Sequence, residues 1–83
     1  MKHKKLLQRL SEFFDMDARA RAQNKEDINE LLSRLKQKEV DLKLKLEITT
    51  DEEERNEMVQ KIDLVHRQRK KGVAMLKKLM SDD

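Results

Sequence analysis

A helix-capping pattern near the middle of the chain is the feature that most constrains its fold. Residues 49–54 have the sequence Thr-Thr-Asp-Glu-Glu-Glu, in which either Thr49 or Thr50 can form a capping box with the glutamate three positions later. The acidic run also suits the positive end of a helix dipole. We therefore expect one long helix to end near Ile48 and another to span about 51–80.

Apolar residues recur at helical spacing on both sides of this turn, which predicts two amphipathic helices. The stripe before the turn comprises Ile28, Leu31, Leu32, Leu35, Leu42 and Leu46. The stripe after it comprises Met58, Ile62, Val65, Val73, Leu76, Leu79 and Met80, with Arg69 and Gly72 on the same side. Two long helices joined by about three residues must lie antiparallel. The predicted fold is therefore an all-α antiparallel hairpin.

Counting residues symmetrically about the turn predicts which side chains meet in this hairpin. Leu35 is expected near Leu64 and Val65, and Ile28 near Gly72. In this register Gly72, the only glycine in the chain, lets the helix of Ile28 come close to its own helix. The alternative is a tolerated glycine that costs about 1 kcal/mol relative to alanine.

Composition favours helix over disorder, although 45% of the residues are charged and only 36% are hydrophobic. The 20 basic and 17 acidic side chains nearly balance, so self-repulsion is weak, and there is no proline. Leu, Lys, Glu, Arg, Gln, Met and Ala predominate, and these residues lose little rotamer freedom in a helix. Alternating polarity at 40–48 is typical of a strand. We interpret it as helix, because no second alternating run exists to pair with it.

A short amphipathic helix is expected at about residues 4–14, with its apolar face formed by Leu6, Leu7, Leu10, Phe13 and Phe14. That face either packs on the hairpin as a third strut or contacts a partner. Basic residues at its border also permit weak binding to an anionic membrane surface. The next helix is expected at about 18–48, with Asn24 as an alternative N-cap. Whether the two helices are continuous stays open, and residues 81–83 form a tail.

The small apolar content predicts self-association. The hydrophobic share is below the roughly 45–50% of an average soluble chain. The alternating pattern at 40–48 also gives the first long helix a second apolar side, although the hairpin supplies only one neighbouring helix. A homodimer that forms a four-helix bundle is the simplest closed arrangement. The residues predicted to mediate self-association are Val40, Leu44, Ile48, Leu64 and Met75.

Charge is strongly segregated along the chain. Residues 1–25 carry seven basic and three acidic side chains, residues 26–60 carry six and eleven, and residues 61–83 carry seven and three. A hairpin therefore has an acidic turn and a basic open end. This basic end is either a solvated surface or a site for an acidic protein partner, nucleic acid or anionic membrane. The candidate binding residues are Lys4, Lys5, Arg9, Arg19, Arg21, Arg67, Arg69, Lys70 and Lys71.

The sequence gives little support for catalysis, and we predict no catalytic residue, cofactor or metal. There is no cysteine for a thiolate zinc site, and one glycine cannot form a phosphate-binding loop. The only histidines are His3 and His66. Asp63 and His66 share one helix face, but two ligands from one turn make a poor metal site. The longest apolar run, residues 73–76, is too short to cross a membrane.

We therefore expect residues 1–83 to form a single helical domain of a cytoplasmic protein that is not an enzyme. The favoured function is a small interaction module that self-associates and offers its N-terminal helix and basic end to a protein partner. A nucleic-acid-binding regulator is the main alternative. The expected hairpin dimer resembles small RNA-binding helical hairpins that regulate plasmid copy number in its architecture, but it shares no motif with them. Peripheral membrane binding is the second alternative.

Overall fold

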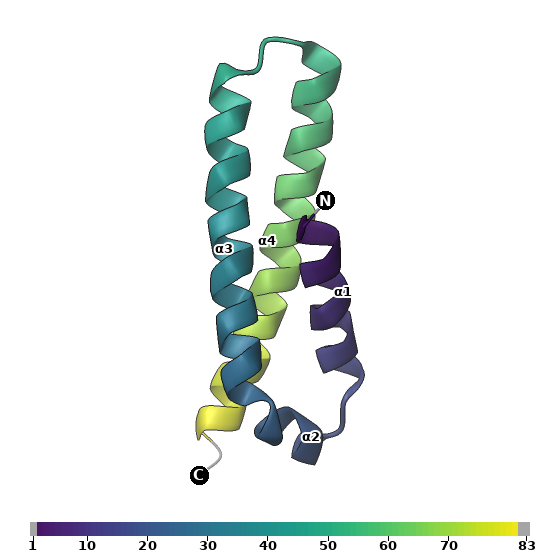
Figure 1. Ribbon diagram of the computed structural model, residues 1–83, viewed down its shortest axis with the longest axis vertical. Coiled ribbons are helices and arrows are strands. Elements are labelled where there is room, and N and C mark those ends of the chain that lie inside the picture. Colours follow the sequence, from purple (N-terminus) through teal and green to yellow (C-terminus); the bar gives the residue numbers. More distant parts are fainter. Residues whose placement is uncertain (1, 82–83) are drawn as a thin grey trace.

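The computed structural model describes residues 2–81, with side chains from residue 4 onward, so the side chain of His3 lies outside it. Of the predicted tail at 81–83, Ser81 is the last residue of a helix, and residues 82–83 lie outside the described residues. All the elements described are helices: α1 (Lys2–Asp15), α2 (Ala18–Gln23), α3 (Lys25–Ile48) and α4 (Glu52–Ser81). Figure 1 shows that α3 and α4 form an antiparallel hairpin, and that α1 folds back along its lower part. The all-α hairpin and the helical interpretation of 40–48 are confirmed.

The turn between α3 and α4 lies where the sequence predicts it, but another residue caps α4. The carboxylate of Asp51 accepts a hydrogen bond from the backbone N–H of Glu54 at 3.0 Å. The hydroxyl of Thr49 instead donates to the carbonyl of Lys45 at 2.7 Å, at the C-terminal end of α3. Both threonine registers of the capping box are therefore wrong. An ionised carboxylate at the N-cap forms a stronger, charge-assisted bond than a hydroxyl does.

The long helix predicted from about residue 18 is interrupted at Asn24, which separates α2 from α3. The backbone N–H of Asn24 and its side-chain amide both donate to the carbonyl of Ala20, at 3.1 and 2.8 Å. Its own carbonyl accepts from Ile28 at 2.9 Å and so begins α3. Asn24 thus marks the boundary that the sequence suggested, but its side chain ends α2 and does not cap α3.

The hydrophobic core lies where α1, α3 and α4 meet. Its buried members are Leu6, Leu10, Phe13, Ile28, Leu31, Leu32, Leu35, Val65 and Leu76. The apolar face of α1 is thus packed on the hairpin, which confirms the third strut. All residues between 40 and 64 are described, and none of them is buried. We call residues 40–64 the turn half and the remainder the three-helix half.

Gly72 of α4 permits a close approach of two other helices. A Cβ atom at this position would lie 2.7 Å from Cδ2 of Leu32 in α3 and 3.0 Å from Cδ1 of Leu10 in α1. The predicted contact of Gly72 with Ile28 is therefore wrong by about one helical turn. Symmetric counting ignores the lean of helical side chains toward their own N-terminus, which moves each contact on α4 further from the turn.

Candidate functional site

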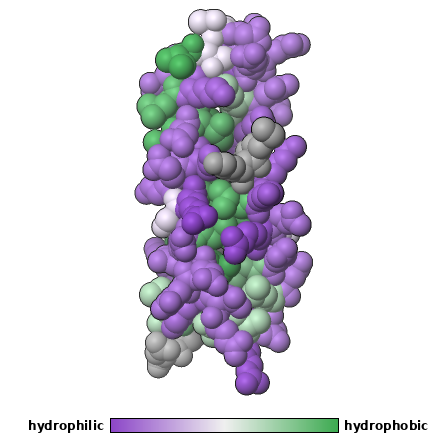
Figure 2. Space-filling view, viewed as in Figure 1, coloured by the Kyte–Doolittle hydropathy of each residue, from purple (hydrophilic) through white to green (hydrophobic). Residues whose placement is uncertain are grey.

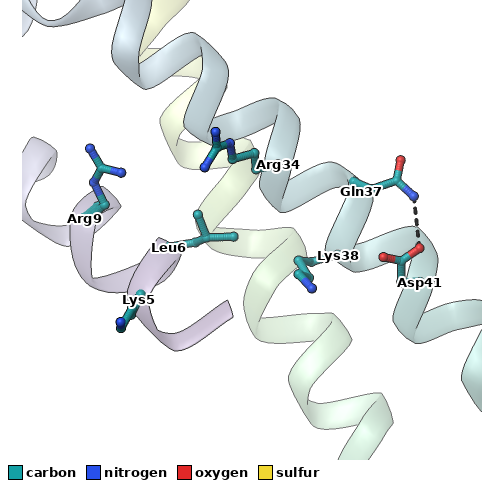
Figure 3. A pocket seen from close by; sticks show the side chains of 7 residues that line it. All are labelled: Lys5, Leu6, Arg9, Arg34, Gln37, Lys38 and Asp41. Carbon is teal, nitrogen blue, oxygen red and sulfur yellow. Dashed lines mark hydrogen bonds between the residues drawn. The ribbon is translucent and has the colours of Figure 1, made fainter. Parts of the chain in front are cut away.

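A basic groove lies between α1 and α3 on the three-helix half (Figure 3). Its volume is about 440 Å³, and it is lined by Lys5, Leu6 and Arg9 from α1 and by Arg34, Gln37, Lys38 and Asp41 from α3. Figure 3 shows Leu6 between the two helices, with cationic side chains on both sides. The groove therefore combines an apolar floor with charged walls.

The cations of the basic groove form two pairs across it. Lys5 and Arg9 are one turn apart on α1, and Arg34 and Lys38 are one turn apart on α3. Because α1 and α3 run antiparallel (Figure 1), Arg9 lies across from Arg34 and Lys5 across from Lys38. Arg9 and Arg34 also line an adjoining depression of about 60 Å³, where Asp27 and Glu30 lie beside them.

The positive charge of the basic groove is only partly neutralised. Arg34 pairs with Glu30 on its own helix at 2.9 Å, with both side chains exposed. The carboxylate of Asp41 accepts a hydrogen bond from Gln37 at 3.0 Å. Among the side chains that the structure describes, Lys5, Arg9 and Lys38 form no ion pair. An anionic group in the groove would therefore find three cations, Lys5, Arg9 and Lys38, that are not already paired with a carboxylate.

The sequence predicted Lys5 and Arg9 as binding residues but missed Arg34 and Lys38. Both belong to residues 26–60, whose net negative charge hides a local basic pair. Their four-residue spacing on one helix face was the available signal. The structure also places Lys5 beside the middle of α3, away from the open end, because α1 folds back along the hairpin.

Two other predicted binding residues hold α1 in place. The guanidinium of Arg21 donates to the carbonyls of Phe13 and Phe14 at 3.3 and 2.6 Å, at the C-terminal end of α1. The ammonium of Lys71 lies 4.5 Å from the ring centroid of Phe14. Both cations therefore tie the rest of the fold to α1.

The remaining basic candidates are dispersed. Arg67 pairs with Asp63 on its own helix at 2.8 Å, whereas Lys4, Arg19 and Lys70 are exposed. Arg69 points into the hairpin, with only 18% of its side chain exposed. The nine predicted residues thus do not form one surface. Lys5 and Arg9 share the basic groove, whereas Arg69 and Lys70 line a separate groove of about 300 Å³ on α4.

A buried ion cluster joins α3 to α4 at the border between the two halves. The side chain of Glu39 is only 5% exposed and accepts a hydrogen bond from Nε of Arg69 at 3.0 Å. Nδ1 of His66 lies 2.6 Å from its other oxygen, and Nζ of Lys43 lies 3.6 Å away. Burial raises the pKa of Glu39, but hydrogen bonds and positive charge from Arg69 and His66 outweigh burial and leave it below its ordinary value.

The burial of Glu39 was not predicted from the sequence, although a signal existed. Glu39 lies on the apolar stripe of α3, in the gap between Leu35 and Leu42, and Arg69 lies on the apolar stripe of α4. Two opposite charges at inward-facing positions of neighbouring helices predict a buried pair. The surrounding abundance of exposed Lys and Glu masked this pattern.

The ion cluster borders a shallow groove of about 320 Å³ on the turn half. It is lined by Glu39, Lys43, Leu46, Val59, Ile62, Asp63 and His66. A carboxylate that orients an imidazole is one part of a nucleophile-activating triad, but no lining residue is a serine, threonine or cysteine. Among the described residues, no group of three or more potential ligands completes a metal site around Asp63 and His66. The arrangement is suited to holding two helices together.

The five predicted self-association residues fall into separate groups. The exposed fractions of Val40, Leu44 and Ile48 are 41%, 58% and 81%, whereas Met75 packs against the core. Val40, Leu44 and Ile48 follow one another at four-residue spacing and form one exposed stripe on the side of α3 opposite the half-buried Leu42 and Leu46.

Leu64 belongs to the opposite side of the hairpin. It lies two turns before Lys71, which contacts α1 through Phe14, so Leu64 is on the α1 side. Val59, which the sequence did not predict for self-association, is 51% exposed and lines the shallow groove. Figure 2 shows hydrophobic side chains along the upper left edge, over the C-terminal half of α3. The turn half therefore exposes several large apolar side chains and contains no buried one.

No helix within residues 2–81 combines the length and the apolar character that a membrane crossing requires. Comparisons of the chain with family models, curated proteins and solved structures give no match.

Proposed function

We propose that this protein is a non-catalytic helical interaction module that self-associates through its turn half. The observation that carries this proposal is the contrast between residues 40–64, which contain no buried side chain, and the large apolar residues exposed there. We define the docking face as the exposed apolar stripe of α3 in the turn half, on the opposite side of that helix from the half-buried Leu42 and Leu46. Its members are Val40, Leu44 and Ile48.

Two helices alone cannot enclose these side chains, but two copies of the hairpin can. Full burial of one large aliphatic side chain contributes about 1.5–3 kcal/mol. A two-fold symmetric pair of hairpins packs the docking face of one copy against the same face of the other, so that the four helices form one bundle. Leu64 and Met75 are left out of this face, since Leu64 lies on the α1 side and Met75 already packs against the core.

Sedimentation over a concentration series tests self-association. Leu44→Glu should shift the protein to monomers, because it places a charge at the centre of the docking face. Leu64→Glu is the matched control on the opposite side, and we expect it to leave the assembly unchanged. A wild-type protein that remains monomeric at high concentration would refute the proposal, as would assemblies that tolerate Leu44→Glu.

Cross-linking provides a second test, because the natural chain has no cysteine. In a two-fold dimer through the docking face, Leu44→Cys should form an intermolecular disulfide on mild oxidation. The exposed Lys4→Cys variant is the control for random collisions, and equal cross-linking of both variants would argue against a defined face.

The two alternatives from the sequence have less support in the geometry. Membrane binding through α1 needs its apolar face, but Leu6, Leu10 and Phe13 are buried in the core. Single-stranded nucleic acid favours exposed aromatic rings beside basic residues. Phe13 is buried, and the ring of Phe14 is covered by the ammonium of Lys71. Titration with RNA over a salt series tests this alternative directly.

A further inference from the structure

We propose that the basic groove between α1 and α3 binds an acidic amphipathic helix of a protein partner. This inference extends the proposed function by assigning a surface that binds the partner. It rests on the proposed function in one respect only, which is that the chain acts as an interaction module. The groove and the docking face lie at different heights along α3, because the groove is lined by α1 and by residues 34–41, whereas the docking face runs from Val40 toward the turn.

The cations of the groove match the spacing of carboxylates on a helix. Lys5 and Arg9 are separated by four residues, as are Arg34 and Lys38. Four residues correspond to about 6 Å along a helix axis. Glutamates four residues apart on a partner helix have this same separation. A helix lying parallel to the groove can therefore bring two carboxylates to two pairs of cations.

The floor of the groove favours a helix with an apolar stripe. Leu6 lies between the walls, and the methylene stems of the lysines and arginines extend the apolar surface around it. A helix that lays its apolar face into a groove between two other helices is a recurrent mode of recognition. Such a partner would add a fourth helix beside the three-helix half, with leucine side chains on Leu6 and carboxylates at the cationic rim.

The same groove suits nucleic acid less well. Phosphate contacts alone would use the cations, but the apolar floor would then remain without a partner, and no aromatic side chain lines the groove for base stacking. Charge together with an apolar floor therefore points to a peptide.

Fluorescence anisotropy of a labelled synthetic helix tests the proposal on the full chain. The probe is a peptide of about 15 residues with glutamate at every fourth position beside a stripe of leucine. Lys5→Gln/Lys38→Gln should weaken its binding about tenfold, since each lost ion pair contributes up to about 1 kcal/mol. A peptide with glutamine in place of glutamate should bind correspondingly weakly.

The matched control is Lys70→Gln/Lys77→Gln, which removes the same charge from exposed positions on α4 outside the basic groove. It should leave binding within about twofold of wild type, because exposed charges at a distance are screened by salt. Lys5→Glu/Lys38→Glu should in turn bind a lysine-bearing version of the same peptide. That rescue would show that the groove variant is folded.

Three results would overturn the proposal. The first is that the groove double variant and the control double variant weaken peptide binding equally. The second is that the peptide shows no saturable binding. The third is that single-stranded poly(U) binds more tightly than the peptide and in a way that depends on the groove cations. The last result would assign the groove to nucleic acid. Sedimentation of the same variants separates this outcome from the proposed function. Lys5→Gln/Lys38→Gln should still self-associate, and Leu44→Glu should still bind the peptide.

Discussion

The two halves of the hairpin use the same two helices and differ in whether a third helix is present. In the three-helix half, α1 covers α3 and α4, and nine hydrophobic side chains become buried. In the turn half the hairpin continues without α1, and no side chain is buried. Amphipathic sequence is present in both halves. The comparison shows that a pair of helices brings apolar side chains together, whereas a third helix is needed to exclude water from them.

Matched leucine truncations should give the largest difference between the halves. Leu35→Ala removes a fully buried side chain from the three-helix half and should lower the free energy of unfolding by about 3–4 kcal/mol. Leu46→Ala removes a half-buried side chain from the turn half, and we expect a loss of about 1 kcal/mol in the monomer.

Urea denaturation at low protein concentration measures both values. Equal losses in dilute solution would break the comparison, because Leu46 would then be as well packed as Leu35. If the loss for Leu44→Ala, on the docking face, grows with protein concentration, self-association supplies the missing burial.

The ion cluster at the border between the halves should give the next largest effect. Glu39→Gln leaves Arg69 largely buried beside a neutral side chain, and we expect a loss of about 2–3 kcal/mol at neutral pH. Glu39→Leu/Arg69→Met removes both charges and should destabilise the protein less than Glu39→Gln does. A double variant that is as unstable as Glu39→Gln would mean that packing, and not the charge pair, determines the loss.

The same cluster predicts how stability changes in acid. The pKa of Glu39 lies below 4.5 in the folded protein and returns to its ordinary value on unfolding. Its contribution is therefore complete above pH 4.5 and is lost as the pH falls through the folded pKa. The stability difference between wild type and Glu39→Gln should shrink in this acidic range, as followed by thermal denaturation. A constant difference at every pH would contradict the assignment.

Gly72→Ala should have the smallest effect and tests how tightly the three-helix half is packed. Alanine gains about 1 kcal/mol of helix propensity, but its Cβ would lie 2.7 Å from Leu32 and 3.0 Å from Leu10. Both leucines are buried, so we expect overpacking to outweigh the gain and to leave a net loss of about 1 kcal/mol. A stabilised variant, measured by thermal denaturation, would show that these leucines move freely. Lys70→Ala, at an exposed position on the same helix, is the control for a general change in α4.

Features encoded locally in the sequence could be predicted. The apolar face of α1 is visible in the spacing of Leu6, Leu10 and Phe13, and the turn follows from the polar run after Ile48. The break at Asn24 was harder, because the preceding alanines and arginines are strong helix formers. It depends on hydrogen bonds from Asn24 back to Ala20 that helix propensity does not describe.

Features that depend on the relative placement of helices could not be predicted. The contact of Gly72 with Leu32 depends on the geometry of the turn and the lean of side chains, which residue counting ignores. The basic groove appears only when α1 lies antiparallel to α3 and brings Arg9 beside Arg34. Partners such as Glu39 and Arg69, thirty positions apart, likewise meet only in the folded hairpin.

The position of Gly72 also affects how this chain can fold as it is synthesised. Leu10 belongs to the earliest helix, yet it packs beside a glycine that follows sixty-two positions later. Leu76, another member of that core, comes later still. During translation, the apolar face of α1 therefore stays exposed to solvent until most of α4 has been synthesised. The hydrophobic core can form only when helices that are far apart in the sequence pack together, even though each helix forms from local contacts.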